Sequence, residues 1–228
     1  RGSMSPWNYT KKALKGIVRP DLNTEEMSTG SALKFYYRAS SIPFVISALL
    51  AVVIAYVVPT VPTSLASLIP FANTAVLREE AMTLAFLGIA LEIFIELPIG
   101  ALIFTAIVQF FSKNIFKFWQ GGYNKTFTAF VFSGFVFVFF MWFVYFERLV
   151  LVPVVMAMLT LGFPLPNWIL VLIFVAIVLP IWALIVLTIT LAKQQNVSIG
   201  KAILGWFVPL LVTIVMIVII GVIALLIG

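Results

Sequence analysis

The chain has no cysteine and no histidine, and its only aspartate is Asp21. These absences exclude disulfides, zinc sites built on cysteine or histidine, catalytic Ser-His pairs and catalytic pairs of aspartates. The sequence also has no Walker-type or GxGxxG loop that could cradle a nucleotide. We therefore expect a protein that is not an enzyme and that uses no cofactor and no metal.

Charged residues are scarce as well. They make up 10% of the chain, whereas hydrophobic residues make up 63%. This composition lies outside the range of soluble globular domains and is typical of polytopic membrane proteins. The formal net charge is +6, but the basic residues gather near the N-terminus and in short loops between apolar runs. That distribution indicates membrane topology, and we expect no binding of nucleic acid.

Five apolar segments are long enough to cross a hydrocarbon core of ~30 Å as helices. They cover residues 42–58, 81–111, 127–146, 168–191 and 202–227. The sequence therefore predicts an all-α polytopic membrane protein with five transmembrane helices in residues 42–228. Residues 149–162 are too few for a further span, and we expect a bent extension or a re-entrant segment there.

The positions of lysine and arginine predict the orientation. Eleven of them lie before the first span or in the loops after the second and fourth spans: Lys11, Lys12, Lys15, Arg19, Lys34, Arg38, Lys113, Lys117, Lys125, Lys193 and Lys201. The other two loops hold only Arg78 and Arg148. Because positive loops stay in the cytoplasm, the N-terminus is expected inside and the C-terminus outside.

The polar N-terminal segment, residues 4–41, is predicted to be cytoplasmic and to contain short interfacial helices; residues 1–3, which precede Met4, are expected to be an expression scar. Its first helix carries apolar and basic side chains suited to an anionic leaflet: Trp7, Lys11, Lys12, Lys15 and Arg19. Asn23 followed by Glu26 resembles a capping box, which predicts that a second helix begins there.

Glu92 and Glu96 lie four residues apart within the second apolar segment, so on an α-helix they share a face. The same face carries Gly88 and Gly100, which indicates close packing of a neighbouring helix. An ionisable residue inside a span is a candidate functional group. The two glutamates are therefore interpreted either as a helix-bridging pair or as a cation or proton site open to the outer side. By helix rise, Arg148 lies at a similar depth; it can pair with one of them or with Glu147.

Two stretches resemble a known family. The sequences FWQGGYNKTFTAFVFSG at 118–134 and IWALIVLTITLAKQQNVSIGKAILGWFVPLL at 181–211 are similar to the YIP family, the Ypt/Rab-interacting membrane proteins. The residues that carry the resemblance are Gly121, Gly122, Thr126, Phe127, Lys201 and Ala202. The family's Asp-Leu-Tyr-Gly-Pro motif is absent, and the nearest fragment is Asp21-Leu22-Asn23, so the resemblance does not extend to binding of Rab-type GTPases.

The resemblance implies five spans, a cytoplasmic N-terminus and a role in trafficking, membrane organisation or as an adaptor. It points to a prokaryotic member, for which the plasma membrane is the expected location. The first hypothesis is thus a non-enzymatic membrane protein of YIP type, with the lipid bilayer and either a cytoplasmic protein or a second copy as partners. The alternative is a small transporter or channel with an outward-facing carboxylate site at Glu92 and Glu96.

Overall fold

The computed structural model describes residues 5–23, 25–57, 83, 86–146, 151, 155, 158–160, 162 and 164–227. Within these ranges the chain is helical and contains no strand. The all-α prediction is therefore confirmed for the part of the chain that is described.

The N-terminal segment forms α1 (Pro6–Val18) and the 3-10 turn η1 (Pro20–Leu22), and α2 (Thr29–Val57) follows. A long helix then contains the π-helical turn η3 (Glu92–Glu96), α5 (Leu97–Gln109) and a second π-helical turn, η4 (Phe110–Ile115). The last elements are α6 (Tyr123–Phe139), α7 (Met141–Phe146), α9 (Asn167–Gln195) and α10 (Ile199–Ile227).

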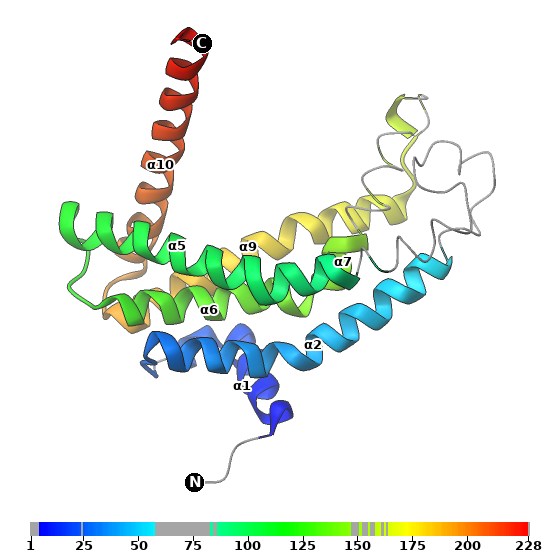
Figure 1. The fold of residues 1–228 in the computed structure, drawn as a ribbon, viewed down its shortest axis with the longest axis horizontal. Helices are drawn as coiled ribbons and strands as arrows, with labels where there is room; N and C mark the ends of the chain where they lie inside the picture. The colour runs from blue at the N-terminus through cyan, green and yellow to red at the C-terminus, as the bar shows by residue number, and fades with distance from the viewer. Residues whose placement is uncertain are drawn as a thin grey trace.

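Helix α6 is the centre of the bundle. It contacts α2, α5 and α9, which run beside it, and α1 packs against both α2 and α6 (Figure 1). The core around α6 is aromatic and branched, with fully buried Phe127, Phe135 and Val136. Phe35 of α2 lies edge-on to Phe135, with ring centroids 5.5 Å apart. The phenylalanine-rich sequence of α6 thus fills the interior of the bundle, where large rings bury much apolar surface.

Three helices are long and apolar enough to cross a membrane by length and composition: Phe86–Ile115, Asn167–Gln195 and Ile199–Leu225. They contain the fourth predicted span and most of the second and fifth. The predicted first span lies within α2 up to Val57. The predicted third span is not one continuous helix, because Phe140, with φ −110° and ψ 16°, separates α6 from α7.

Helix α10 leaves the bundle after its first turns (Figure 1). Ala202 and Gly205 are buried against its neighbours, whereas Ile214, Ile217 and Ile220 are each about half exposed or more. The exposed side chains occupy every side of the helix. A helix that is apolar all round suits a lipid environment.

The predicted capping box at Asn23 and Glu26 is wrong. Helix α2 begins at Thr29, whose backbone N–H donates to the side chain of Asn124 at 3.1 Å. Asn23 is instead buried, and its amide points to a different element, as described below. From Thr29, α2 continues as one helix through the expected boundary at residue 41, so the N-terminal segment and the first span share an element.

Candidate functional site

The backbone at Glu92–Glu96 is a π-helical turn. The proline at position 98 accounts for the hydrogen bonds that are missing from this part of the helix. The N–H of Leu97 donates to the carbonyl of Glu92, five residues back. Proline at position 98 has no N–H, so it cannot donate to the carbonyl of Ile93 in a π turn or to that of Phe94 in an α turn. Ile93 therefore has no helical donor, because Leu97 donates to Glu92, and Phe94 loses its α-helical donor.

Helix α2 supplies the missing donors. The hydroxyl of Tyr36 donates to the carbonyl of Ile93 at 2.8 Å, and the hydroxyl of Tyr37 donates to the carbonyl of Phe94 at 3.2 Å. Tyr36 is 3% exposed and Ile93 is fully buried. The buried carbonyl of Ile93 and the more exposed carbonyl of Phe94 are thus both satisfied by a neighbouring helix, as backbone in an apolar medium requires.

Glu92 lines a partly open pocket of about 360 Å³. Its other walls come from α5, α6, α7 and α9: Leu97, Phe137, Met141, Val144, Ala176, Leu179 and Pro180. Glu96 is exposed and is not among the lining residues. The structure therefore separates the two glutamates that the sequence placed on one face: Glu92 faces a pocket, and Glu96 does not.

Another wall of this pocket belongs to a second helix that contains a proline. Pro180 lies inside α9 and has no N–H for the carbonyl of Ala176, four residues earlier. Ala176 and Pro180 both line the pocket that Glu92 lines. A carboxylate thus lies between two helices whose hydrogen-bond ladders are interrupted by proline.

Of the other residues predicted around Glu92, Gly88 and Gly100 are not among the described residues that line the pocket. A Cβ added to Gly100 would meet no described atom within 4 Å, so no described helix packs closely on it. Gly88 is half-buried one turn before Glu92. Glu147 and Arg148 lie outside the described residues.

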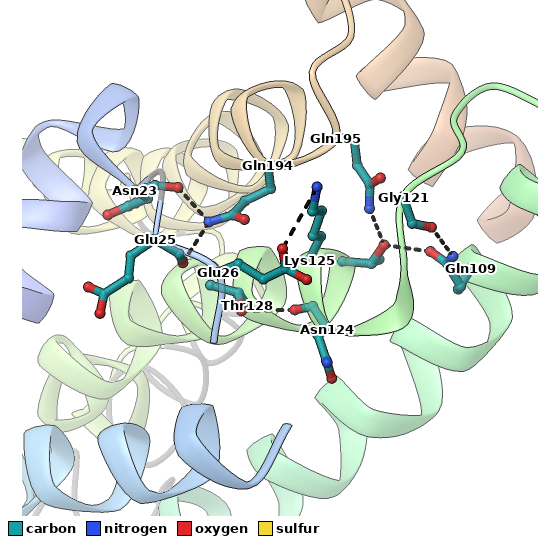
Figure 2. A network of polar contacts seen from close by, with 11 residues as sticks. Asn23, Glu25, Glu26, Gln109, Gly121, Asn124, Lys125, Thr128, Gln194 and Gln195 are labelled. Atoms are coloured by element: carbon teal, nitrogen blue, oxygen red, sulfur yellow. Dashed lines mark hydrogen bonds and ion pairs between the residues drawn. The ribbon is translucent and has the colours of Figure 1, made fainter. Parts of the chain in front are cut away.

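A polar network occupies the end of the bundle where α5, α6, α9 and α10 meet their short connections (Figure 2). Gln109 donates to the carbonyl of Gly121 at 2.7 Å and accepts from the hydroxyl of Thr126 at 2.7 Å. Gln195 donates to Thr126 at 2.9 Å, and Trp119 donates to Gln109 at 3.2 Å. The network ties the 116–122 connection to α5 and α9.

A side chain at one glycine position of this network would displace Gln195. A Cβ on Gly121 would lie 1.7 Å from Oε1 of Gln195, whereas a Cβ on Gly122 would meet nothing within 4 Å. Of the remaining residues that resemble the YIP pattern, Phe127 and Ala202 are fully buried and Lys201 is exposed in the first turn of α10. These residues therefore build the end of the bundle, and none of them is among the described residues that line the Glu92 pocket.

A second set of polar contacts anchors the N-terminal segment. Asn23 donates to the carbonyl of Gly16 and to the hydroxyl of Thr190, each at 3.0 Å. Gln194 donates to the backbone carbonyls of Asn23 and Glu25, at 2.7 and 3.0 Å (Figure 2). The N-terminal segment is thus fixed to the last turns of α9. Polar residues interrupt the apolar sequence of α9 there, and this pattern is the sequence signal that could have indicated such contacts.

Helix α1 has two distinct faces. Thr10, Ala13 and Ile17 are buried, and the hydroxyl of Thr10 donates to the carbonyl of Ala39 in α2 at 2.9 Å. Packing is close, because a Cβ on Gly16 would lie 2.6 Å from the ring of Phe132 in α6. The sequence predicted a helix that lies on lipid; one face of that helix in fact packs on protein.

The opposite face remains exposed. Trp7, Leu14 and Val18 are 52%, 47% and 62% exposed, and Lys11 lies 5.2 Å from the centroid of the Trp7 ring. These four residues recur every three or four positions and so form one stripe, with the exposed Lys15 beside it. We call Trp7, Lys11, Leu14 and Val18 the α1 stripe.

Two other basic residues of this segment form ion pairs. Lys12 forms an ion pair with Glu25, and Arg19 bonds Asp21 at 3.2 Å. The hydrogen bond from Arg19 holds the pKa of the Asp21 carboxyl below its usual value. Lys11 and Lys15 are therefore the basic side chains most closely associated with the α1 stripe.

No family model matches this chain, and no curated protein or solved structure matches it. Function is therefore inferred from the residues and contacts of the chain itself.

Proposed function

We propose that this chain is a non-enzymatic membrane protein of YIP type that uses its docked N-terminal helix to organise the cytoplasmic leaflet or to act as an adaptor on it. The observation that carries the proposal is the α1 stripe. An exposed row of Trp7, Leu14 and Val18 with Lys11 among them combines apolar and cationic groups. That combination favours an anionic lipid surface.

The position of α1 supports this role. It packs beside the first half of α2, near Ala39, just before the expected membrane boundary at Ile42. The polar network of Gln109, Gln194 and Gln195 lies at the same end of the bundle as the lysine-rich connections. Amide-rich contacts and lysines both favour placing this end at the cytoplasmic interface.

The proposed topology has five spans, with the N-terminus in the cytoplasm and the C-terminus outside. The three long apolar helices and the uneven distribution of lysine and arginine support it. Helix α10 projects to the side of the bundle (Figure 1). For α10 to cross the same bilayer as the other helices, it must rotate toward the bundle axis. Its apolar surface beyond Pro209 is largely exposed, so few contacts within the protein oppose this rotation.

Hydrogen exchange of the full chain in lipid nanodiscs tests this function. The amides of α1 are expected to exchange more slowly in nanodiscs that contain phosphatidylglycerol than in purely zwitterionic ones. Lys11→Glu should remove most of this difference. Lys34→Glu is the matched control, because Lys34 is an exposed lysine on α2, outside the stripe. Equal exchange of α1 in both lipids would contradict the proposed leaflet contact.

A second candidate function, transport of a cation or proton, is favoured by the Glu92 pocket. A carboxylate between two proline-interrupted helices is an arrangement that membrane transporters use for substrate and ion sites. In proteoliposomes, Glu92→Gln should abolish cation or proton flux, whereas Glu96→Gln should preserve it. Absence of flux from a well-folded wild-type protein would exclude this candidate.

A further inference from the structure

Helix α10 is fixed to η4 at one point. Pro209 lies inside α10 and has no N–H for the carbonyl of Gly205, four residues earlier. The hydroxyl of Ser112 in η4 donates to that carbonyl. Packing is close here, because a Cβ on Gly205 would lie 1.8 Å from the ring of Trp119. We call Ser112, Trp119 and Gly205 the η4–α10 junction.

Three lysines lie beside this junction. Lys113 follows Ser112 in η4. Lys117 directly precedes Phe118, whose backbone N–H donates to the carbonyl of Ser112 at 2.7 Å. Lys201 lies one turn before the junction glycine, on the same side of α10. We call Lys113, Lys117 and Lys201 the junction lysines.

The charge of the junction lysines is not balanced by the sequence around them. Residues 97–146 and 148–228 contain no aspartate or glutamate. The carboxylates of residues 21–26 form ion pairs with other basic residues of the chain. An anionic group from outside the chain is therefore the counter-charge that this surface fits.

Exposed apolar side chains border the junction on both elements. Phe110 and Ile115 of η4 are about half exposed, and so are Leu204 and Phe207 of α10. A phospholipid presents a phosphate and acyl chains together, and basic sites between the ends of membrane helices bind such headgroups. We propose that the η4–α10 junction binds one anionic phospholipid. Its phosphate contacts the junction lysines, and its acyl chains lie against the exposed apolar side chains of both elements.

A fluorophore beside the junction tests this inference, since the chain has no native cysteine. The full chain, labelled at Leu204→Cys, is placed in nanodiscs of phosphatidylcholine and phosphatidylglycerol, with one or the other lipid brominated at the same mole fraction. Quenching should show a preference for phosphatidylglycerol of about fivefold or more, because one lysine near an anionic surface contributes about that factor. The same label at Ile220→Cys, exposed further along α10, should show no preference.

Neutralisation of the junction lysines should remove the preference at position 204. The triple variant Lys113→Gln, Lys117→Gln, Lys201→Gln is expected to lower it to about twofold or less. Lys201→Gln alone changes one exposed side chain and should already lower the preference severalfold.

The matched control removes the same net charge from other lysines: Lys34→Gln, Lys125→Gln, Lys193→Gln. Lys125 pairs with Glu26 at 3.8 Å, and Lys34 and Lys193 are exposed on α2 and α9. This control should keep the preference at position 204. An equal loss in both triple variants would overturn the inference, because net charge alone would then explain the preference.

Equal quenching by the two lipids at position 204 of the otherwise unchanged chain would also overturn the inference. The junction shares no residue with the α1 stripe, so Lys11→Glu should leave the preference at position 204 unchanged. A preference there without lipid contact of α1 would refute the proposed function alone. Lipid contact of α1 without a preference at the junction would refute the present inference alone.

Discussion

The hydroxyl of Tyr36 donates a hydrogen bond of 2.8 Å to the backbone carbonyl of Ile93, a carbonyl that its own helix cannot serve. The N–H of Leu97 is directed to Glu92, and Pro98 has no N–H. This contact joins α2 to the turn that begins with Glu92. It therefore holds the Glu92 wall of the pocket in place.

Removal of this hydroxyl should destabilise the protein. Tyr36→Phe leaves a buried carbonyl without a donor, which typically costs about 1–3 kcal/mol. Tyr37→Phe is the matched control, since Tyr37 is 41% exposed and its bond to Phe94 is longer, at 3.2 Å. Thermal unfolding in detergent should rank the wild type and Tyr37→Phe above Tyr36→Phe. Equal loss in both variants would contradict a special role for Tyr36.

Pro98→Ala should make the Tyr36 hydroxyl less important. Alanine supplies an N–H at position 98, so the turn can return to α-helical bonding and Leu97 can donate to Ile93. In a double-mutant cycle, Tyr36→Phe should therefore cost less in the Pro98→Ala background than in the wild type. Strict additivity of the two changes in unfolding free energy would disprove the proline explanation of the π turn.

Gly121→Ala should disrupt the polar network at the end of the bundle. The new methyl group would fall 1.7 Å from Oε1 of Gln195, and overpacking of this kind costs about 1–3 kcal/mol. Gly122→Ala introduces the same group one residue later, where nothing lies within 4 Å. Thermal unfolding should show a loss for Gly121→Ala only. A similar effect of both changes would mean that the connection adapts and that Gln195 is not fixed.

Asn23→Ala should loosen α1 from the bundle. The change removes the two donated bonds to Gly16 and Thr190 while it keeps the backbone carbonyl that Gln194 contacts. Faster amide exchange across α1 is the expected result, because the anchor at its C-terminal end is weakened. Asn8→Ala alters an exposed asparagine of α1 and should leave exchange unchanged. Unchanged exchange in Asn23→Ala would show that packing alone docks the helix.

The helical content of this chain could be predicted from the sequence, since the apolar runs at 168–191 and 202–227 fall inside α9 and α10. The break between α6 and α7 at Phe140 could not be predicted, because nothing in the local sequence distinguishes this residue from its phenylalanine neighbours. Asn23 misled the capping prediction for a different reason. Its amide binds Thr190, 167 residues away, and a distant partner of that kind cannot be read from local spacing.

The candidate site could be predicted only in part. The sequence identified Glu92 and Glu96 as unusual, because carboxylates are rare inside apolar helices. It could not predict that only Glu92 lines a pocket, because that pocket is built by residues of α6, α7 and α9 that are far away in the chain. The basic helix at the N-terminus was predicted from the sequence. Its buried face was not predicted, because that face depends on a contact between Thr10 and Ala39, which are far apart in the sequence.

The central claim is that the α1 stripe contacts lipid, and the absence of native cysteine allows a direct measurement. A fluorophore attached to Leu14→Cys should be quenched by brominated lipids in nanodiscs that contain phosphatidylglycerol. The same fluorophore on Asn8→Cys, an exposed position off the stripe, should be quenched much less. Strong quenching at position 14 only would support a helix that binds protein with one face and the leaflet with the other. Equal or absent quenching at the two positions would contradict it.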